Sequence, residues 1–343
     1  MIRHLLIASL VVTTVLTMPV YPAAQQKQVS AATAHASKPY SPPKTPWGDP
    51  DIHGGYTNVD ESGIPMEKPS QFAGRSLEEV DDSELADIVR ERSERAAARI
   101  NAAYVPLFPG DTGGGPEHWY ENSRSKNSRA WMVVDPPDGI IPPLTPAAIE
   151  RQRVRNATGG GGGAPGVGRA DSYTDRSFYD RCITRGFPGS MMPTIYGNSY
   201  DITQGPGVVA IRYEMIHETR IIPLDNHPRT GHLSHMGDAR GHWEGDTLVV
   251  ETTNFDPRTA YRNASSKLRL IERFEPTAPG TLEWSMTVDD PTTWTRPWTF
   301  AMRFSPDKQG LFEYACHEGN YAMKNLLSGA RAEERAAVEA SVK

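Results

Sequence analysis

The sequence lacks several patterns that would assign it to a common functional class. It has no stripe of basic residues and no acidic tail, and its formal net charge is −6, so we expect no nucleic-acid partner. It has no Gly-x-Ser-x-Gly motif, which argues against an α/β-hydrolase. Its run of glycines, residues 159–163, is not followed by Lys-Ser or Lys-Thr, so it is not a phosphate-binding loop.

The sequence has one long apolar run, which lies near the N-terminus, and no other run is long enough to span a membrane. Arg3 precedes an almost wholly apolar run, residues 5–20, and small residues follow it. This order is typical of a secretory signal peptide, and the absence of a cysteine near residue 20 excludes a lipoprotein anchor. We predict a signal peptide over residues 1–24, a periplasmic or secreted protein, and no membrane association after cleavage. The alternative is a retained N-terminal membrane anchor.

Cysteine is scarce, with only Cys182 and Cys316. In an oxidising compartment, an even pair predicts one disulfide. Closing so long a loop stabilises a fold by about 4–5 kcal/mol in the chain-entropy model. The alternative is a catalytic thiolate beside His317.

The C-terminal part of the chain alternates apolar and polar residues with a period of two. From about residue 195, such segments recur between turn residues without an intervening helix, which favours antiparallel neighbours. Because closure removes exposed edges, seven or eight such strands favour a barrel or a curled sheet. We predict a mainly β fold, with a lipocalin-like antiparallel meander over residues 195–343 and closing helices at 319–327 and 330–341. The predicted strands contain Val209–His217, Ile222–Leu224, Leu248–Val250, Leu268–Phe274, Leu282–Val288, Trp298–Phe304 and Phe312–Cys316.

Residues 25–194 are predicted to form a helical and loop-rich extension that packs on the barrel. Ser76 and Glu79 make a capping box before a first helix, on which Arg92 belongs to the solvated face. Thr145 is expected to cap a second, shorter helix, because a proline follows it at the first helical position.

The strand pattern places His217 on the apolar face, at the end of its strand, where the mouth of a barrel would lie. A histidine there is suited to act as a general acid or base, and Arg220 would stabilise negative charge developing on an oxygen. The alternative is a buried histidine that bonds one carbonyl. The cavity would be lined by side chains for which plain core packing is the alternative: Tyr213, Trp284, Met286, Trp298 and Phe300.

A second polar cluster follows the last predicted strand. His317 would be a second proton-transfer group, supported by Glu318 and Tyr321. The alternative is that Glu318 and Asn320 cap a helix and that His317 is simply adjacent.

Four histidines, namely His227, His232, His235 and His242, lie close together in the sequence. Such a group is able to ligate zinc or copper, but the spacing matches no helix-borne pair and no cysteine joins it. We therefore predict a solvated loop, no metal and no cofactor.

Several short sequence motifs occur together along the chain. They are WGDPD (47–51), VDPPDG (134–139), Arg181-Cys182, WEGDTLVV (243–250) and CHEGNY (316–321). In combination they resemble a large family of exported bacterial proteins, most of which have no assigned activity. The resemblance covers nearly the whole mature chain and implies one domain and an exported location, but it carries no reaction. The family usually has tryptophan where this chain has Tyr56.

From these patterns we predict an exported enzyme that carries out acid–base chemistry of the isomerase, lyase or cyclase type. It would act without a cofactor on a small, largely apolar molecule. One alternative is a non-catalytic, lipocalin-like binding protein, and another is a metal-dependent hydrolase that uses the loop from His227 to His242. A structural envelope protein without a pocket is the third alternative. The sequence does not indicate the substrate or the oligomeric state.

Overall fold

A computed structural model describes residues 40–101, 126–157, 170–225, 228–229, 231–259 and 261–341. The predicted signal peptide, the run of glycines and His227 lie outside these residues.

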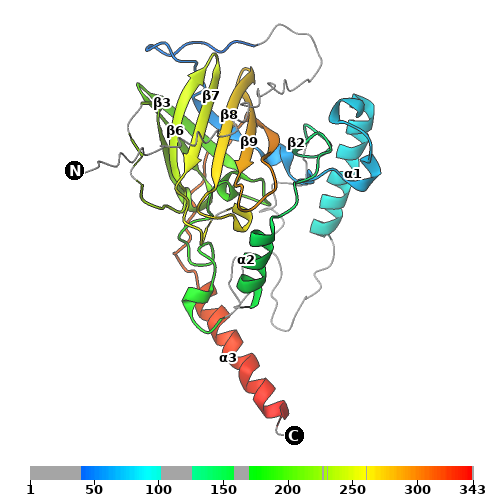
Figure 1. Cartoon of the computed structure of the whole chain (residues 1–343), viewed down its shortest axis with the longest axis vertical. Coiled ribbons are helices and arrows are strands. Elements are labelled where there is room, and N and C mark those ends of the chain that lie inside the picture. The colour runs from blue at the N-terminus through cyan, green and yellow to red at the C-terminus, as the bar shows by residue number, and fades with distance from the viewer. Residues whose placement is uncertain are drawn as a thin grey trace, which may run out of the picture. The chain divides into compact units, whose positions relative to one another are not determined.

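The described residues form one antiparallel sheet of ten strands, shown in Figure 1. Its strands are β1 (Gly54–Thr57), β2 (Val133–Asp135), β3 (Ser199–Gly205), β4 (Val208–Tyr213), β5 (Thr219–Pro223), β6 (Asp238–Glu244), β7 (Thr247–Thr253), β8 (Arg269–Ala278), β9 (Thr281–Asp289) and β10 (Trp298–Pro306). The order is β5-β4-β3-β1-β10-β9-β8-β7-β6, and β2 pairs with β10 in addition. The predicted antiparallel β fold is confirmed as a curled sheet that does not close into a barrel.

The two edges of the sheet, β5 and β6, approach each other without hydrogen-bonded pairing in the described residues. A Cβ on Gly241 of β6 would lie 2.8 Å from Leu224 Cδ2 and 2.9 Å from Ile222 Cγ2. Because real Cβ atoms do not approach other atoms so closely, glycine permits this packing of β6 against β5. Side chains, rather than a backbone ladder, therefore join the two edges.

The period-two prediction is confirmed most clearly in β9 and β10. Every second residue of β9 is buried from Leu282 to Val288, while the residues between them are partly exposed. In β10, Phe300 packs edge-on against Trp284 of β9, with ring centroids 5.7 Å apart. Fully burying one such large apolar side chain stabilises a fold by about 1.5–3 kcal/mol, so these strands form the main core.

Strand β1 was not predicted, and it lies in the part of the chain that was expected to be helical and loop-rich. It nevertheless lies inside the sheet, where Tyr56 is opposite Tyr200 of β3 on one side and Pro306 of β10 on the other. The Tyr56 side chain is buried, and its hydroxyl donates to the Ile52 carbonyl at 2.8 Å. This short strand joins the two halves of the sheet.

Three helices are described: α1 (Asp82–Asn101), α2 (Pro146–Ala157) and α3 (Ala322–Ser341). Thr145 caps α2 as predicted, since its hydroxyl accepts from Ala148 N at 3.1 Å. The predicted capping box of Ser76 and Glu79 is confirmed, although it begins a short 3-10 turn before α1. No described helix combines the length and the apolar character that crossing a bilayer requires.

Three local predictions were wrong. Arg92 of α1 is buried instead of solvated, because its guanidinium donates to Asn127 Oδ1 at 2.8 Å and to the Ala130 carbonyl at 2.5 Å. The last predicted strand, from Phe312 to Cys316, is not a strand, and Phe312 is 59 % exposed. The two predicted closing helices form the single helix α3.

Candidate functional site

The predicted cavity-lining side chains do lie together on the inner face of the sheet. They are completely buried and belong to one hydrophobic cluster: Tyr213, Trp284, Met286, Trp298 and Phe300. They pack against each other and against neighbouring core side chains, for example Trp298 against Phe300 with ring centroids 5.9 Å apart. Their inward orientation is as expected, and a role in substrate binding stays a prediction.

Arg220 also points into this interior, where it forms a buried ion pair. Its Nη2 lies 2.7 Å from Glu272 Oε2, and the guanidinium stacks 4.1 Å from the ring centroid of Phe187. The other carboxylate oxygen of Glu272 accepts from Trp284 Nε1 at 3.2 Å. Burial raises the pKa of Glu272, while the charge of Arg220 opposes that rise. The pair links β5 to β8 across the curled sheet.

The prediction that His217 faces the interior is wrong, because its side chain is exposed. Strand β4 ends at Tyr213, and residues Met215–His217 form a 3-10 turn in which Ile216 and His217 have φ angles of 60° and 40°. The alternation that would carry His217 inward therefore stops before this residue. An acid–base group at His217 has no access to the buried residues.

The neighbouring Glu218 is partly buried, and no sequence pattern pointed to it. Its carboxylate accepts from Ser190 Oγ at 3.2 Å. Burial raises its pKa, and hydrogen bonds from Thr184 and Ser190 partly offset that effect. A lone glutamate beside a turn gives no sequence signal that its carboxylate is buried and hydrogen-bonded.

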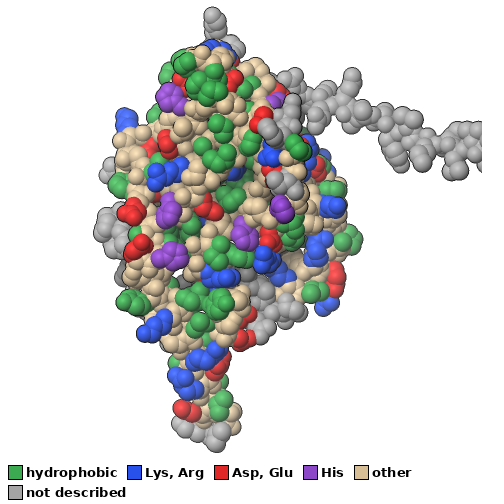
Figure 2. Space-filling view, turned by 90° about the vertical axis from the view of Figure 1, so that its left-hand side faces the viewer, with side chains coloured by type: hydrophobic (Ala, Val, Ile, Leu, Met, Phe, Trp, Pro, Cys, Tyr) green, Lys and Arg blue, Asp and Glu red, His purple; other side chains and the backbone are tan. Residues whose placement is uncertain are grey.

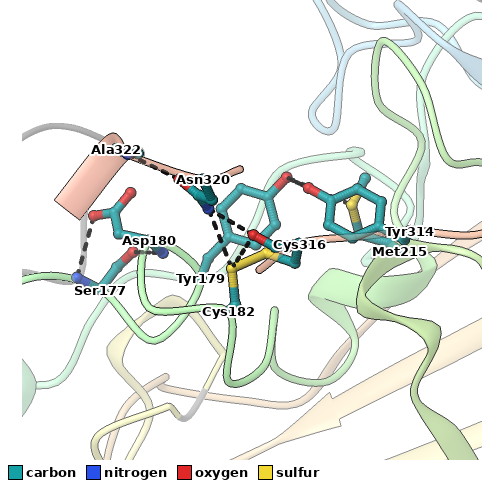
Figure 3. Close-up of a disulfide and its surroundings, with 9 residues drawn as sticks. All are labelled: Ser177, Tyr179, Asp180, Cys182, Met215, Tyr314, Cys316, Asn320 and Ala322. Atoms are coloured by element: carbon teal, nitrogen blue, oxygen red, sulfur yellow. Dashed lines mark hydrogen bonds between the residues drawn. A yellow bond between two sulfur atoms is a disulfide. The ribbon is translucent and has the colours of Figure 1, made fainter. Parts of the chain in front are cut away.

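The predicted disulfide between Cys182 and Cys316 is confirmed, with Cα atoms 5.9 Å apart (Figure 3). No cysteine is free, so a catalytic thiolate at Cys316 is excluded. Asn320 lies beside the disulfide, where its Nδ2 donates to the Cys316 carbonyl at 2.7 Å. Its Oδ1 accepts from Ala322 N at 2.8 Å, so Asn320 caps α3, as one alternative predicted.

A pocket of about 360 Å³ opens next to this disulfide, and we call it the disulfide pocket. Its walls come from residues 173–183 and residues 317–323, two segments that are distant in sequence. Eight residues line the pocket, namely Tyr173, Asp180, Arg181, Cys182, Ile183, His317, Asn320 and Met323.

Only one of the five predicted catalytic residues lines this pocket, namely His317. Glu318 and Tyr321 are exposed outside its lining, and Tyr321 is 67 % exposed. Arg181 belongs to one of the motifs on which the predicted family resemblance rests, but nothing in its spacing indicated a binding role. The pocket was missed because its walls are brought together by the disulfide rather than by a local sequence pattern.

Two tyrosines support the chain next to the pocket. The hydroxyls of Tyr179 and Tyr314 lie 3.0 Å apart, and Tyr179 also contacts Met215 Sδ at 3.5 Å (Figure 3). Burial, together with the Tyr314 hydrogen bond, raises the pKa of Tyr179 to about 12. These contacts attach the segment that carries Arg181 to the turn after β4.

The histidine loop shows no metal site among the described residues, where no three histidine, cysteine or acidic side chains are placed to hold an ion. His235 packs on Phe178 with ring centroids 4.6 Å apart, and His242 lies 3.2 Å from Glu244 Oε1. Figure 2 shows histidines spread over one face among arginine and lysine side chains. The metal-dependent hydrolase therefore gains no support from these residues.

Comparisons with known proteins do not assign the chain to a family. No protein-family model matches the chain, and a search of curated proteins finds no match.

Proposed function

We propose that the protein is an exported small-molecule-binding protein and that its ligand occupies the disulfide pocket. The observation that carries the proposal is the pocket itself, about 360 Å³ in volume. Its lining combines apolar side chains, Ile183 and Met323, with the polar groups of Arg181 and His317. Ligand sites of small molecules have this size and this mixture of apolar walls and a few polar groups.

The pocket suits a ligand better than the interior of the sheet does. A lipocalin-like protein would hold its ligand inside the sheet, but Trp284, Trp298 and Phe300 already fill that space. The pocket walls are instead held by the disulfide and by the hydrogen bond from Asn320 to Cys316. Preformed walls lower the entropic cost of binding, since less of the chain has to be ordered when the ligand enters.

Two observations support export. The chain begins with the residues of a signal-peptide pattern, and its two cysteines form a disulfide. Disulfides persist in the periplasm and outside the cell, whereas cytosolic reductants keep most thiols reduced.

A pocket-filling variant tests the proposed site. We expect Ile183→Trp to abolish the thermal stabilisation that ligands from a small-molecule library give to the purified protein. Ile140→Trp is the matched control, because Ile140 is 44 % exposed and Ile183 is 41 % exposed, and Ile140 does not line the pocket. Ligands that stabilise both variants equally would place the binding site elsewhere.

Acid–base catalysis is a second candidate function, and the position of His317 in the same pocket as Arg181 favours it. A histidine beside a guanidinium is able to move a proton while the cation stabilises negative charge on an oxygen. In this case His317→Asn retains ligand binding but loses turnover of the bound molecule. Equal turnover by the wild-type protein and the variant rules out this role.

A further inference from the structure

The side chain of Arg181 lines the disulfide pocket, and no described residue is its charge partner. Its guanidinium carbon lies 5.4 Å from the ring centroid of Tyr173 and 5.3 Å from that of Phe178. The side chain is half-buried, yet it forms no hydrogen bond or ion pair with any residue that the structure describes. Contact with the two rings restricts the guanidinium, while its N–H donors lie in the plane of the guanidinium and remain available.

The one acidic residue of the pocket lining does not supply that partner. Asp180 forms an ion pair with Arg176, 3.6 Å away, and it accepts from Ser177 N at 3.3 Å. Its side chain is only 6 % exposed. The negative charge of Asp180 is therefore matched inside the protein, and the pocket keeps the positive charge of Arg181.

Asn320 adds no free acceptor to the pocket. Both ends of the Asn320 amide are already used, by the Cys316 carbonyl and by Ala322 N. His317 has no side-chain hydrogen bond with a described residue. The pocket lining thus combines the N–H donors of Arg181 with the apolar side chains of Ile183 and Met323.

From this arrangement, and resting on the proposed binding function, we infer that the ligand is a small organic carboxylate. Its carboxylate is held by Arg181, and its apolar part lies against Ile183 and Met323. The planar guanidinium presents two parallel N–H groups that match the two oxygens of a carboxylate.

Arg258 provides a matched control on the same aromatic ring. Its guanidinium carbon lies 5.6 Å from the Phe178 centroid, close to the corresponding distance for Arg181. Unlike Arg181, it is already bound to a carboxylate, because its Nη2 donates to Asp256 Oδ2 at 2.5 Å. Arg258 is not part of the pocket lining.

The test uses benzoate and its neutral analogue benzamide as probes, with binding to the purified protein followed by NMR titration at low salt. We expect benzoate to bind at least about tenfold more tightly than benzamide, and Arg181→Gln to weaken benzoate by a similar factor. Arg181→Lys should recover part of the loss, because it restores the charge without the planar pair of donors. Arg258→Gln should change benzoate binding by less than about twofold.

Several outcomes overturn the inference. They are equal binding of benzoate and benzamide, unchanged benzoate binding by Arg181→Gln, and no binding of benzoate at about 10 mM. The proposed function fails separately, when Ile183→Trp leaves the binding of every library ligand intact. If Ile183→Trp blocks the binding of a ligand that Arg181→Gln does not affect, the pocket is a binding site but its ligand is not held through a carboxylate.

Discussion

Two arginines of this protein lie against aromatic rings in very different surroundings. Arg220 is buried in the sheet, over the ring of Phe187, and Glu272 neutralises it at 2.7 Å. Arg181 lies in the disulfide pocket against the rings of Tyr173 and Phe178, and no described carboxylate pairs with it.

The difference follows from access to water. A charge in the core needs an internal partner, because desolvation costs several kcal/mol for each unpaired ion. A half-exposed guanidinium retains part of its hydration, so the fold tolerates it without a partner. We conclude that Arg220 serves the stability of the fold, while Arg181 is available to a ligand.

The largest expected effect comes from removing the partner of Arg220. We expect Glu272→Gln to lower the free energy of unfolding by about 3–5 kcal/mol, because it leaves a buried guanidinium unpaired. Urea unfolding monitored by tryptophan fluorescence measures the change. Glu150→Gln is the control, since Glu150 pairs with Arg153 at 2.7 Å on the surface and its loss should have no measurable effect. An unchanged urea midpoint for Glu272→Gln would show that the buried pair is dispensable.

Removing the disulfide should affect the pocket more than the sheet. We expect the double variant Cys182→Ser, Cys316→Ser to lose about 2–5 kcal/mol of stability, because the bond joins residues 134 positions apart. Hydrogen exchange should increase in residues 173–183 before it increases in β8 and β9. Equal increases in both regions would contradict the separation between pocket and core.

The alkaline stability of the protein should depend on Tyr179. Its pKa is raised to about 12 in the fold, whereas an unfolded tyrosine ionises near pH 10. Between these values the unfolded chain loses the proton first, so the free energy of unfolding falls as pH rises through this window. We expect Tyr179→Phe to flatten that decline in urea unfolding measured from pH 9 to about 12. The exposed Tyr321→Phe is the control, and equal slopes for all three proteins would exclude Tyr179 as the cause.

The smallest expected effect is that of Arg181→Gln on stability. Since Arg181 forms no described ion pair and the variant loses only its contacts with two aromatic rings, the free energy of unfolding should fall by about 1 kcal/mol. Urea unfolding next to Glu272→Gln then compares the two arginine environments directly. A loss similar to that of Glu272→Gln would mean that Arg181 is a structural residue.

The sequence predicted the core strands well because each of them has one buried face. Trp284 and Met286 of β9 follow the period of two and are both fully buried. The period-two prediction was wrong at His217, because a turn that contains Ile216 in a left-handed conformation follows the strand. A β-branched residue rarely adopts that conformation, so the sequence did not indicate the turn. Strand β1 was missed because it has only four residues and begins with two glycines.

The candidate site was much harder to predict than the fold. Arg181 and His317 come together through tertiary structure, and neither a helical nor a strand period relates them. The disulfide was predictable from an even pair of cysteines in an oxidising compartment, and the candidate pocket lies beside it. What the sequence did not reveal is which charges remain unpaired after folding, because that depends on every neighbour in space.

The position of β1 sets the order in which the chain is able to fold. Strand β1 covers residues 54–57, but one of its two partners, β10, begins only at Trp298 and ends at Pro306. The pairing that joins the two halves of the sheet therefore cannot form until β10 has been synthesised. Such distant pairing slows folding.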